Sequence, residues 1–407
     1  MDDSGQIKQE NRCNCNQEQQ GKWLSVIIPM YNAGPFIKKC LDSMILGEAG
    51  MNALEVLVVD DGSTDGACVV VENYVRRWPQ TFRLLKKKNA GHGSAVNLGV
   101  SCCTGRYLKV VDTDDWVQTE ELGKMLKLLQ RIRQMDAVLC GYRILDIRSG
   151  KVQNIRAQIR QPLQKETAED ASLQGDSFAC LTLGEVLRDW DNYKRLFCLH
   201  GLIYGTDFYR SMHRDLPEHV SYDDAYFDVV YASRSDRLCA ADLSVYVYRI
   251  GDPHQSVSSR NRAERIRDLE TVLLRILKTA PHADSHSKAG RAYWYRRICP
   301  FLTDYFITAF LRVPNRRKGR LYASRFYRKL KTGDPGLWRM IRKKYMLLKV
   351  MGLLHIRDTW LTKLLELKAC AVDFRCRRQC TSKVQRVHGQ KWKHTMAACT
   401  PLEGSES

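Results

Sequence analysis

Three carboxylates fall within four positions of the chain, at Asp112, Asp114 and Asp115, directly after the apolar run YLKVV. A second acidic cluster, DDGSTD, occupies residues 60–65 after another apolar run. Carboxylates so close together repel one another unless a cation lies among them, and hard oxygen ligands suit Mg²⁺ or Mn²⁺, which leave positions for substrate phosphates. The spacing therefore predicts a divalent-metal site that tolerates a diphosphate, although an acidic turn or a helix cap after a strand gives the same spacing.

The elements that would position these clusters alternate along the chain. Strands are indicated by apolar runs at 24–28, 54–59, 82–85, 107–111 and 137–142, and helices by amphipathic segments at 35–46, 67–78, 94–101 and 120–134. This succession predicts an α/β fold with a mostly parallel sheet and helices on both faces. Ligands of such sheets bind beyond the carboxyl ends of the strands, so the polar segments PMYN, DDGSTD, NAGHG and DTDD are expected on one rim.

The alternation is lost at residues 146–180, which indicate a loop or a short insertion. Regular elements return with a helix at 183–191, apolar segments at 197–204 and 222–232, and a strand at 243–248. From about residue 261 the chain is rich in Arg, Lys, Leu and Met without turn-separated strands, which predicts a helical C-terminal region.

The charge of the chain is unevenly distributed. Residues 1–250 carry 31 Lys and Arg against 33 Asp and Glu, whereas residues 251–407 carry 34 against 12. This predicts an acidic partner for the C-terminal third, either anionic lipid headgroups or nucleic acid. Residues 312–349 interleave aromatic and aliphatic residues with cations, as helices on an anionic bilayer do, but a helical bundle packed on the rest of the protein with a solvated basic face fits equally. Nucleic acid is disfavoured because no recognition motif is present.

The fifteen cysteines show no CxxC pair and no zinc-ligand spacing. Free thiols and a reducing, cytosolic compartment are therefore expected. Residues 1–22 have the composition of a disordered leader rather than a signal peptide. No run of about 18 apolar residues occurs, so no membrane span is expected.

Three segments together resemble family 2 glycosyltransferases, which have the GT-A fold: LSVIIPMYNAGPFIKKCLDSM, LEVLVVDDGSTDG and NAGHGSAVNLGVSCCTGRYLKVVDTDDW. The resemblance is close over residues 23–145 and looser to about residue 258. It implies a catalytic domain at 23–258, with a nucleotide-sugar-binding half at 23–145 and an acceptor half at 181–258, followed by the basic helical region 259–407. It also implies an inverting transferase that uses a nucleotide-diphosphate sugar and a divalent metal.

The resemblance assigns nucleotide-sugar-binding roles to Pro29, Tyr31, Asn32, Asp60, Asp61, Ser63, Gly91, His92, Asp112, Asp114 and Asp115. Asp61 would contact the base, Asp112 would approach the ribose, and Asp114 with Asp112 would hold Mg²⁺ or Mn²⁺. Ser63 or Asp65 is also expected to cap the following helix.

Inversion needs a base that takes the proton of the attacking acceptor hydroxyl. The family has an Asp at a helix start, usually in a Glu-Asp pair, and the segment VSYDDAYFDVV places Asp224 there with Asp223 in the position of the Glu. An ordinary Asp pKa of about 3.9 would keep Asp224 deprotonated. A helix cap with acidic first-turn residues is the alternative interpretation and is compatible with the first.

Two departures from the family pattern qualify the resemblance. Val96 stands where many relatives carry an Arg that could bind phosphate, so either another group such as His92 or Lys88 compensates or the diphosphate has fewer contacts. The Gln-x-x-Arg-Trp motif and the membrane helices of processive polysaccharide synthases are missing, which favours a single-transfer enzyme. Beyond the motifs, His200 could line the acceptor pocket, and His254 and Gln255 could close over the diphosphate, although core and surface-loop roles are also open.

The sequence thus predicts a cytoplasmic glycosyltransferase on the inner face of the cell membrane that adds one sugar to a glycan or lipid-linked glycan in cell-surface polysaccharide biosynthesis. The alternative from a different class is a non-catalytic basic scaffold that binds lipid or RNA and retains the GT-A domain. A nucleotidyltransferase is disfavoured because PMYNAGPF is not the Gly-rich, Arg- or Lys-bearing loop of those enzymes.

Overall fold

The computed structural model describes residues 21–159, 178–252, 259–280 and 287–356. The expected leader lies outside these ranges apart from its last two residues, and so do His254 and Gln255. The nine cysteines within them are all free thiols, as expected. Over the same ranges, no helix combines the length and the hydropathy that crossing a bilayer requires.

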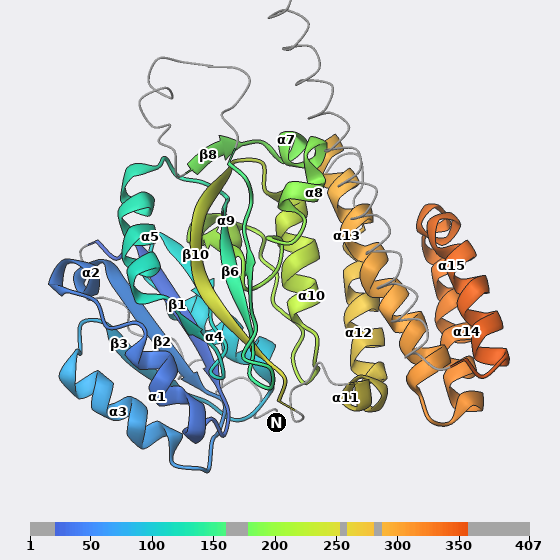
Figure 1. Ribbon diagram of the computed structural model, residues 1–407, viewed down its shortest axis with the longest axis horizontal. Helices are drawn as coiled ribbons and strands as arrows, with labels where there is room; N and C mark the ends of the chain where they lie inside the picture. The colour runs from blue at the N-terminus through green and yellow to red at the C-terminus, as the bar shows by residue number, and fades with distance from the viewer. Residues whose placement is uncertain (1–20, 160–177, 253–258, 281–286, 357–407) are drawn as a thin grey trace, which may run out of the picture.

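A ten-stranded sheet occupies the left-hand half of the molecule in Figure 1, in the order β3-β2-β1-β4-β9-β6-β10-β5, with β7 paired to β6 and β8 to β10. The strands are β1 Leu24–Met30, β2 Leu54–Asp60, β3 Phe82–Lys86, β4 Tyr107–Val110, β5 Trp116–Val117, β6 Ala137–Asp146, β7 Val152–Ile155, β8 Phe178–Leu181, β9 Leu202–Gly205 and β10 Leu238–Ile250. The first four strands are parallel, and β9 lies antiparallel between β4 and β6. Strands β1, β2 and β4 are buried along their whole length, because both faces of a parallel sheet are covered.

Helices cover both faces of the parallel part of the sheet. They are α1 Gly34–Asp42, α2 Glu48–Ala53, α3 Ala67–Arg77, α4 His92–Cys102 and α5 Thr119–Arg131. The connection from β3 to β4 runs opposite to the two before it, so right-handed crossovers place α4 on one face and α1 and α3 on the other. Gly99 lets α4 approach β1 closely, since a Cβ there would lie 2.4 Å from Cγ2 of Ile27.

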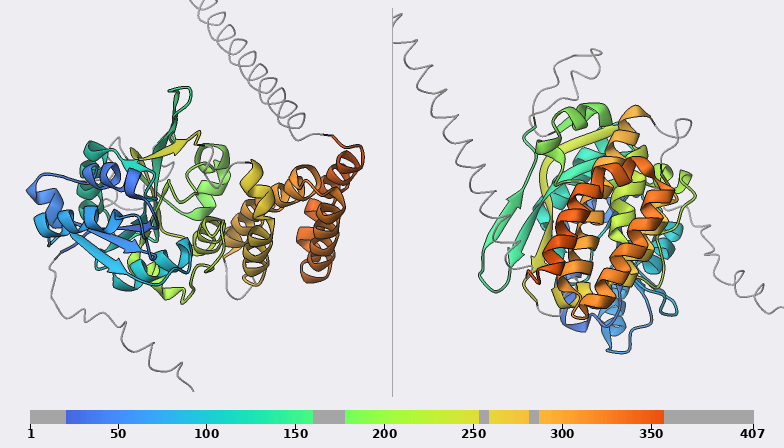
Figure 2. Two further views of the ribbon diagram at one scale, coloured as in Figure 1. Left: turned by 90° about the horizontal axis from the view of Figure 1, so that it is seen from below. Right: turned by 90° about the vertical axis from the view of Figure 1, so that its right-hand side faces the viewer.

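The rest of the chain after β7 is mainly helical outside the sheet. Its helices are α7 Leu183–Arg188, α8 Trp190–Tyr193, α9 Thr206–Ser211, α10 Asp224–Tyr226, the π-helix η1 Phe227–Tyr231, the 3₁₀-helix η2 Ala232–Arg234, α11 Ser259–Glu264, α12 Ile266–Leu277, α13 Lys288–Ile307, the π-helix η3 Thr308–Arg312, α14 Arg316–Gly333 and α15 Pro335–Leu353. Helix α13 packs against α7, η1 and η2, and α14 and α15 pack on η3 and α13. The pair α14 and α15 forms one end of the molecule (Figure 2).

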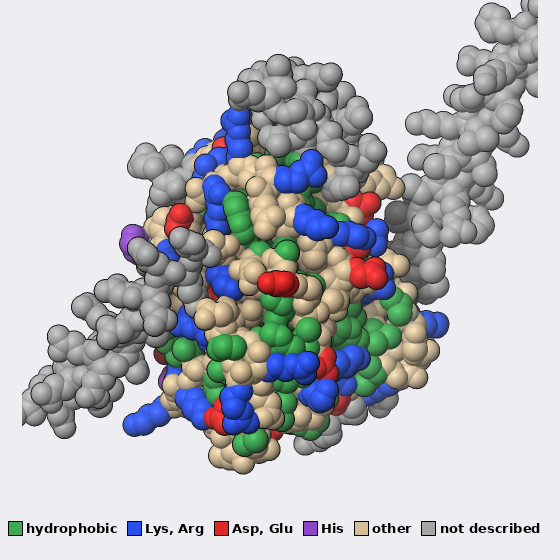
Figure 3. Space-filling view, turned by 90° about the vertical axis from the view of Figure 1, so that its left-hand side faces the viewer, with side chains coloured by type: hydrophobic (Ala, Val, Ile, Leu, Met, Phe, Trp, Pro, Cys, Tyr) green, Lys and Arg blue, Asp and Glu red, His purple; other side chains and the backbone are tan. Residues whose placement is uncertain are grey.

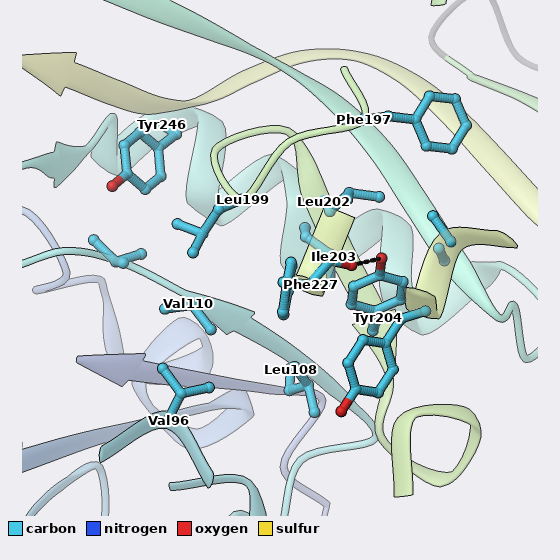
Figure 4. Close-up of a cluster of buried hydrophobic side chains, with 14 of the residues drawn as sticks. Val96, Leu108, Val110, Phe197, Leu199, Leu202, Ile203, Tyr204, Phe227 and Tyr246 are labelled. Carbon is cyan, nitrogen blue, oxygen red and sulfur yellow. Dashed lines mark hydrogen bonds between the residues drawn. The ribbon is translucent and has the colours of Figure 1, made fainter. Parts of the chain in front are cut away.

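The hydrophobic core joins the sheet to the helical region. Figure 4 shows Leu108 of β4 and Ile203 of β9 in one cluster with Val96 of α4 and Phe227 of η1. The same continuous set of buried side chains includes Trp294 and its neighbours on α13. The helical region therefore shares the core of the sheet rather than building a separate one.

Two local expectations from the sequence differ from the structure. The loop expected at residues 146–180 contains β7 and β8, which pair with β6 and β10. Strand β7 is exposed over three of its four residues, so it has no apolar alternation that would indicate a strand. The helix expected at 183–191 divides at Asp189 into α7 and α8, and α7 begins with a capping box formed by Thr182 and Glu185.

Candidate active site

A cavity of about 710 Å³ opens at the carboxyl ends of β1, β2 and β4. The rim predicted from the sequence is therefore present: Pro29, Tyr31, Asp61, Gly91, His92, Asp112 and Asp114 all line the cavity. The opposite wall is formed by residues 219–224 and by the start of α12. Asp224 lines this second wall, so the structure brings it together with the strand-end residues.

Part of each loop after β1 and β2 contacts the other loop rather than the cavity. Asn32 has a left-handed backbone with φ 48°, its side-chain oxygen accepts from Thr64 N at 2.8 Å, and its own N–H donates to Oγ of Ser63. Asp60 is buried and accepts from Ser63 N at 2.9 Å. None of Asn32, Asp60 and Ser63 lines the cavity. These three predicted binding residues therefore lie outside the cavity and hold its two rim loops in place by hydrogen bonds.

The helix cap expected from Ser63 or Asp65 takes a different form. Gly66 is the N-cap residue of α3 and makes no side-chain cap, so Ser63 does not cap the helix. Asp65 accepts instead from Ala67 N at 3.1 Å and from Gly34 N at 2.7 Å. Its carboxylate thus joins the starts of α1 and α3.

Asp61 fixes the loop between β3 and α4. One of its oxygens accepts from Nζ of Lys87 at 2.6 Å and from Ala90 N, and the other accepts from Gly91 N at 2.8 Å. Lys87 was not predicted as a site residue, because it follows β3 without a motif. Because three protein donors already hold the Asp61 carboxylate, its charge is compensated within the protein at the cavity wall.

His92, the first residue of α4, bridges two carboxylates. Its Nδ1 lies 2.7 Å from Oδ2 of Asp223 and its Nε2 lies 3.1 Å from Oδ1 of Asp112. Burial alone would lower the pKa of His92, but the two carboxylates raise it well above its usual range. A doubly protonated imidazolium therefore joins Asp112 to Asp223.

The three carboxylates after β4 occupy different surroundings. Asp112 and Asp114 line the cavity. Asp115 is buried beside it, where it accepts from Tyr246 O–H at 2.6 Å and from Arg249 N at 2.7 Å. Burial and the charges of its two acidic neighbours raise the pKa of Asp115 well above its usual range. Its position differs from the one expected of a residue in contact with a nucleotide sugar.

The donor atoms needed for a divalent cation are present near the end of β4. One ligand atom from each of Asp112, Asp115 and His200 lies within 4.8 Å of the others. Burial lowers the pKa of His200 to about 4, so its ring is neutral and keeps a lone pair for a metal. The predicted ligands Asp112 and Asp114 both face the cavity. This oxygen-rich set fits Mg²⁺ or Mn²⁺.

Asp224 is exposed within the second wall of the cavity. Desolvation by the surrounding protein and the negative charge of Asp223 raise the pKa of Asp224 to about 6. This is above the ordinary value assumed from the sequence. Asp223 is the N-cap residue of α10, but its side chain makes no capping hydrogen bond. The Asp223 carboxylate is instead hydrogen-bonded to Nδ1 of His92.

The C-terminal helical region contributes charged residues that no motif revealed. Arg265, directly before α12, lines the cavity and donates to Oγ of Ser221 at 2.9 Å. Asp268 accepts from Ser221 N at 3.2 Å. Two residues are possible substitutes for the Arg that Val96 replaces. His92 lies in the cavity between two carboxylates, whereas Lys88 does not line the cavity.

His200 lies in the cavity as expected, stacked on Tyr248 with ring centroids 4.1 Å apart. The Tyr246 ring is tilted against the His200 ring, with centroids 4.8 Å apart. The side chain therefore presents an aromatic surface to the cavity. The role of His200 toward an acceptor stays a prediction.

Comparison with known proteins adds three findings. Residues 25–190 match the family model described as glycosyl transferase family 2. The chain is 33% identical over 119 residues to an uncharacterized glycosyltransferase, EpsJ, of Bacillus subtilis, and 34% identical over 130 residues to the dolichyl-phosphate beta-glucosyltransferase of Dictyostelium discoideum. The matches cover 29% and 30% of this chain but only 33% and 40% of those relatives.

Among solved structures, TarS 1–349 of S. aureus in complex with UDP-GlcNAc is similar to this chain with a TM-score of 0.54 at 17% identity. The match covers 81% of this chain and 90% of that one. At this identity the likeness concerns the fold, and it extends well beyond residues 25–190. The predicted fold class, a GT-A-like sheet followed by helices, is confirmed.

Proposed function

Because residues 25–190 of this chain belong to glycosyl transferase family 2, we propose that the protein transfers one sugar from a nucleotide-diphosphate sugar to an acceptor hydroxyl with inversion at the anomeric carbon. The observation that carries the proposal is the shared cavity, in which strand-end carboxylates face Asp224 from another part of the chain. The TarS fragment of similar fold is named as a complex with UDP-GlcNAc, which is compatible with this donor class.

The proposed base is Asp224. As the acceptor oxygen bonds to the anomeric carbon, the bond from that carbon to the diphosphate oxygen breaks, and the acceptor proton passes to the Asp224 carboxylate. The raised pKa of about 6 makes this carboxylate a better proton acceptor than an ordinary Asp while leaving it ionised at neutral pH. Asp223, held by His92, fixes the start of α10 beside it.

The donor diphosphate is proposed to lie near Asp112 and Asp114, which would hold Mg²⁺ or Mn²⁺, with Asp115 and His200 close by. The cation would offset the charge of the diphosphate against the carboxylates. Besides the metal ion, Arg265 is proposed as a second positive group that contacts the diphosphate, because it lines the same cavity. Val96 is uncharged at the position where many relatives carry Arg, so that position supplies no cation.

The acceptor class is proposed to be a glycan or a lipid-linked glycan of cell-surface polysaccharide biosynthesis. The name of the Dictyostelium relative includes a lipid phosphate, which is compatible with a lipid-linked acceptor. An acceptor of this kind would bring the protein to the inner face of the cell membrane.

Titration calorimetry tests the proposal with the full chain and a panel of UDP, GDP, dTDP and CDP, with and without Mn²⁺ or Mg²⁺. We expect one diphosphate to bind, and to bind only with the metal. A screen of the matching donor sugars for metal-dependent hydrolysis then identifies the sugar. Absence of binding across the panel would favour the alternative, a non-catalytic basic scaffold that binds lipid or RNA.

A further inference from the structure

The exposed apolar side chains of this protein are concentrated on one helix. Of the eleven large hydrophobic side chains that are exposed among the described residues, six lie on α15 or directly after it. They are Met340, Met346, Leu347, Val350, Leu353 and Leu354, each between 49% and 68% exposed. Isolated exposed apolar residues are normal on a soluble surface, but a contiguous set of this kind indicates an interaction site.

Helix α15 is apolar on two separate faces. The inner face carries Leu337, Ile341, Tyr345 and Leu348, which are buried at intervals of four, four and three residues. The outer face carries Met340, Leu347, Val350 and Leu354 at intervals of seven, three and four, which is also the helical period. A surface helix of a globular protein needs only the inner stripe, so packing on α13 and η3 does not account for the outer one.

Cations flank the outer stripe, and Lys343 interrupts it between Met340 and Leu347. Arg339, Arg342, Lys343, Lys344 and Lys349 are all exposed on α15. Within the described ranges, none of these five has a carboxylate partner at ion-pair distance. Residues 316–354 together contain 13 Lys and Arg and a single acid, Asp334.

The opposite end of the molecule has a different surface. In Figure 3, which shows that end, Lys and Arg are interspersed with Asp and Glu and with scattered hydrophobic side chains. The α14 and α15 helices are at the far end, where the right-hand panel of Figure 2 shows them in front of the rest of the described chain. No described segment packs over the outer face of α15 in these views.

We propose that the outer face of α15 inserts into the interfacial layer of an anionic lipid bilayer. Leu347, Val350 and Leu354 would enter the boundary of the acyl chains, and the flanking cations would contact lipid phosphates. This arrangement is that of an interfacial helix, whose apolar face penetrates about 5–10 Å while its basic residues remain among the headgroups. The inference depends on the distribution of apolar and charged side chains and is independent of the proposed sugar transfer.

Vesicle flotation of the full chain tests the proposal. We expect binding to vesicles of phosphatidylcholine with phosphatidylglycerol and none to phosphatidylcholine alone. The apolar variant Leu347→Gln/Val350→Gln/Leu354→Gln should bind the anionic vesicles at least about tenfold more weakly, because the inserted area is lost. The charge variant Lys343→Gln/Lys344→Gln/Lys349→Gln should bind them about a hundredfold more weakly, since each surface cation contributes about fivefold.

Matched controls use exposed residues of the catalytic part. The apolar control is Val69→Gln/Ile147→Gln/Val152→Gln, and the charge control is Lys38→Gln/Lys127→Gln/Lys151→Gln. Both controls should bind vesicles as the unchanged protein does. Nucleotide binding and thermal unfolding should be unaltered in all four variants, because every substituted side chain is exposed and outside the cavity. These two readouts separate failure of this inference from failure of the proposed transfer.

Four results would overturn the proposal. The first is vesicle binding that the apolar variant retains in full, which would leave only electrostatic attraction. The second is equal binding to neutral and anionic vesicles. The third is a dimer in sedimentation velocity that the apolar variant dissociates, without vesicle binding by either form. The fourth is RNA binding, unaffected by the apolar substitutions, in place of vesicle binding.

Discussion

At the scale of single residues, His92 determines how the two walls of the cavity meet. Asp112 follows the fourth strand and Asp223 precedes α10, and they are more than a hundred residues apart in the chain. The imidazole between them supplies one positive charge to both. The position of the proposed base, next to Asp223, is thus set partly by a residue on the donor side.

Replacement of Asp224 by Asn tests the base directly. The amide keeps the size of the side chain but cannot accept the acceptor proton, so kcat should fall about 10²- to 10⁴-fold. Nucleotide affinity measured by calorimetry should remain, because the substitution leaves the strand-end residues unchanged. Asp191→Asn, at a side chain that is 90% exposed, is the matched control and should keep full activity. Unchanged turnover in Asp224→Asn would remove this residue from the mechanism.

The pH profile of kcat/KM should follow the Asp224 carboxylate. Its pKa of about 6 lies above the ordinary Asp value, and the base acts only when deprotonated. We therefore expect kcat/KM to be level above about pH 7 and to fall about tenfold per pH unit well below 6. The measurement is an initial-rate profile with saturating metal, accompanied by thermal unfolding at each pH. A rate that stays level down to about pH 4 would contradict the assignment.

Replacement of Arg265 by Gln tests the cation that the C-terminal region adds to the cavity. If Arg265 contacts the diphosphate, the Kd of the nucleotide diphosphate should rise about tenfold or more, because charge-assisted hydrogen bonds contribute about 1.5–3 kcal/mol. The Kd of the corresponding nucleoside should not change, since it carries no phosphate. Arg275→Gln, exposed on the same helix but outside the cavity, is the control. Equal weakening of nucleoside and diphosphate would indicate a purely structural role.

At the scale of elements, the π-helix η1 links the proposed base to the C-terminal helices. Asp228 on η1 is buried and accepts from Arg297 of α13 at 2.9 Å, and its backbone carbonyl accepts from Tyr293 O–H at 2.8 Å. Arg297 also donates to the carbonyl of Phe197. Helix α13 thus holds the segment that begins at Asp224, and π-helical turns of this kind are frequent at functional sites.

The variant Arg297→Met should destabilise this connection, because it leaves Asp228 buried without its counter-charge. The free energy of unfolding should fall by about 3–5 kcal/mol, as measured by chemical denaturation. The double variant Arg297→Met/Asp228→Asn should recover part of the loss by removing both charges. Arg296→Met, at the exposed neighbouring position, removes only a hydrogen bond to the Leu187 carbonyl and a contact with the Trp190 ring, and should cost about 1 kcal/mol. If Arg297→Met is as stable as Arg296→Met, the ion pair between Arg297 and Asp228 contributes little to stability.

The sequence predicted the parallel half of the sheet well because its strands are continuous apolar runs that end in polar turns. Leu24–Met30 and Leu54–Asp60 differ from the expected strands by one or two residues at one end. Strand β7 was missed because its exposed residues Val152, Gln153 and Asn154 have no burial pattern. Its pairing with β6 is a tertiary contact that local propensity does not encode.

The site was predictable only in part, for a related reason. Asp61, Asp112 and Asp224 stand in recognisable motifs, and the structure places all three in one cavity. Arg265 follows no motif and reaches the cavity only because α12 packs beside α10. Asp115 is buried, unlike Asp112 and Asp114, and its carboxylate accepts from Tyr246 O–H. Tyr246 lies on β10, far along the chain, so the residues around position 112 do not reveal this contact.

At the scale of the whole molecule, the shared core argues that the catalytic part needs the helices that follow it. Tyr226 and Phe227 are buried in the same cluster as Tyr293 and Trp294 of α13. Removal of α13 would expose this surface and leave Asp228 without Arg297. The boundary of the family match at residue 190 is therefore not a boundary of folding.

A chain that ends at residue 258 should accordingly fail to form a cooperative native state. We expect it to aggregate or to bind the dye ANS with a loss of near-UV circular dichroism, as loosely packed states do. A chain that ends at residue 356 retains all described helices and should unfold cooperatively near the temperature of the full protein. A shorter chain that melts cooperatively at that same temperature would show that the two regions are independent.

The composition of the cavity from two distant parts of the chain has a consequence for biosynthesis. The strand-end loops leave the ribosome long before residues 219–268, which form the other wall. N-terminal segments begin to fold during translation, but a donor molecule can stabilise only the state that binds it. The nascent strand-end loops therefore cannot be stabilised by a donor that needs both walls, and their native packing is completed only after residues 219–268 and α13 have left the ribosome.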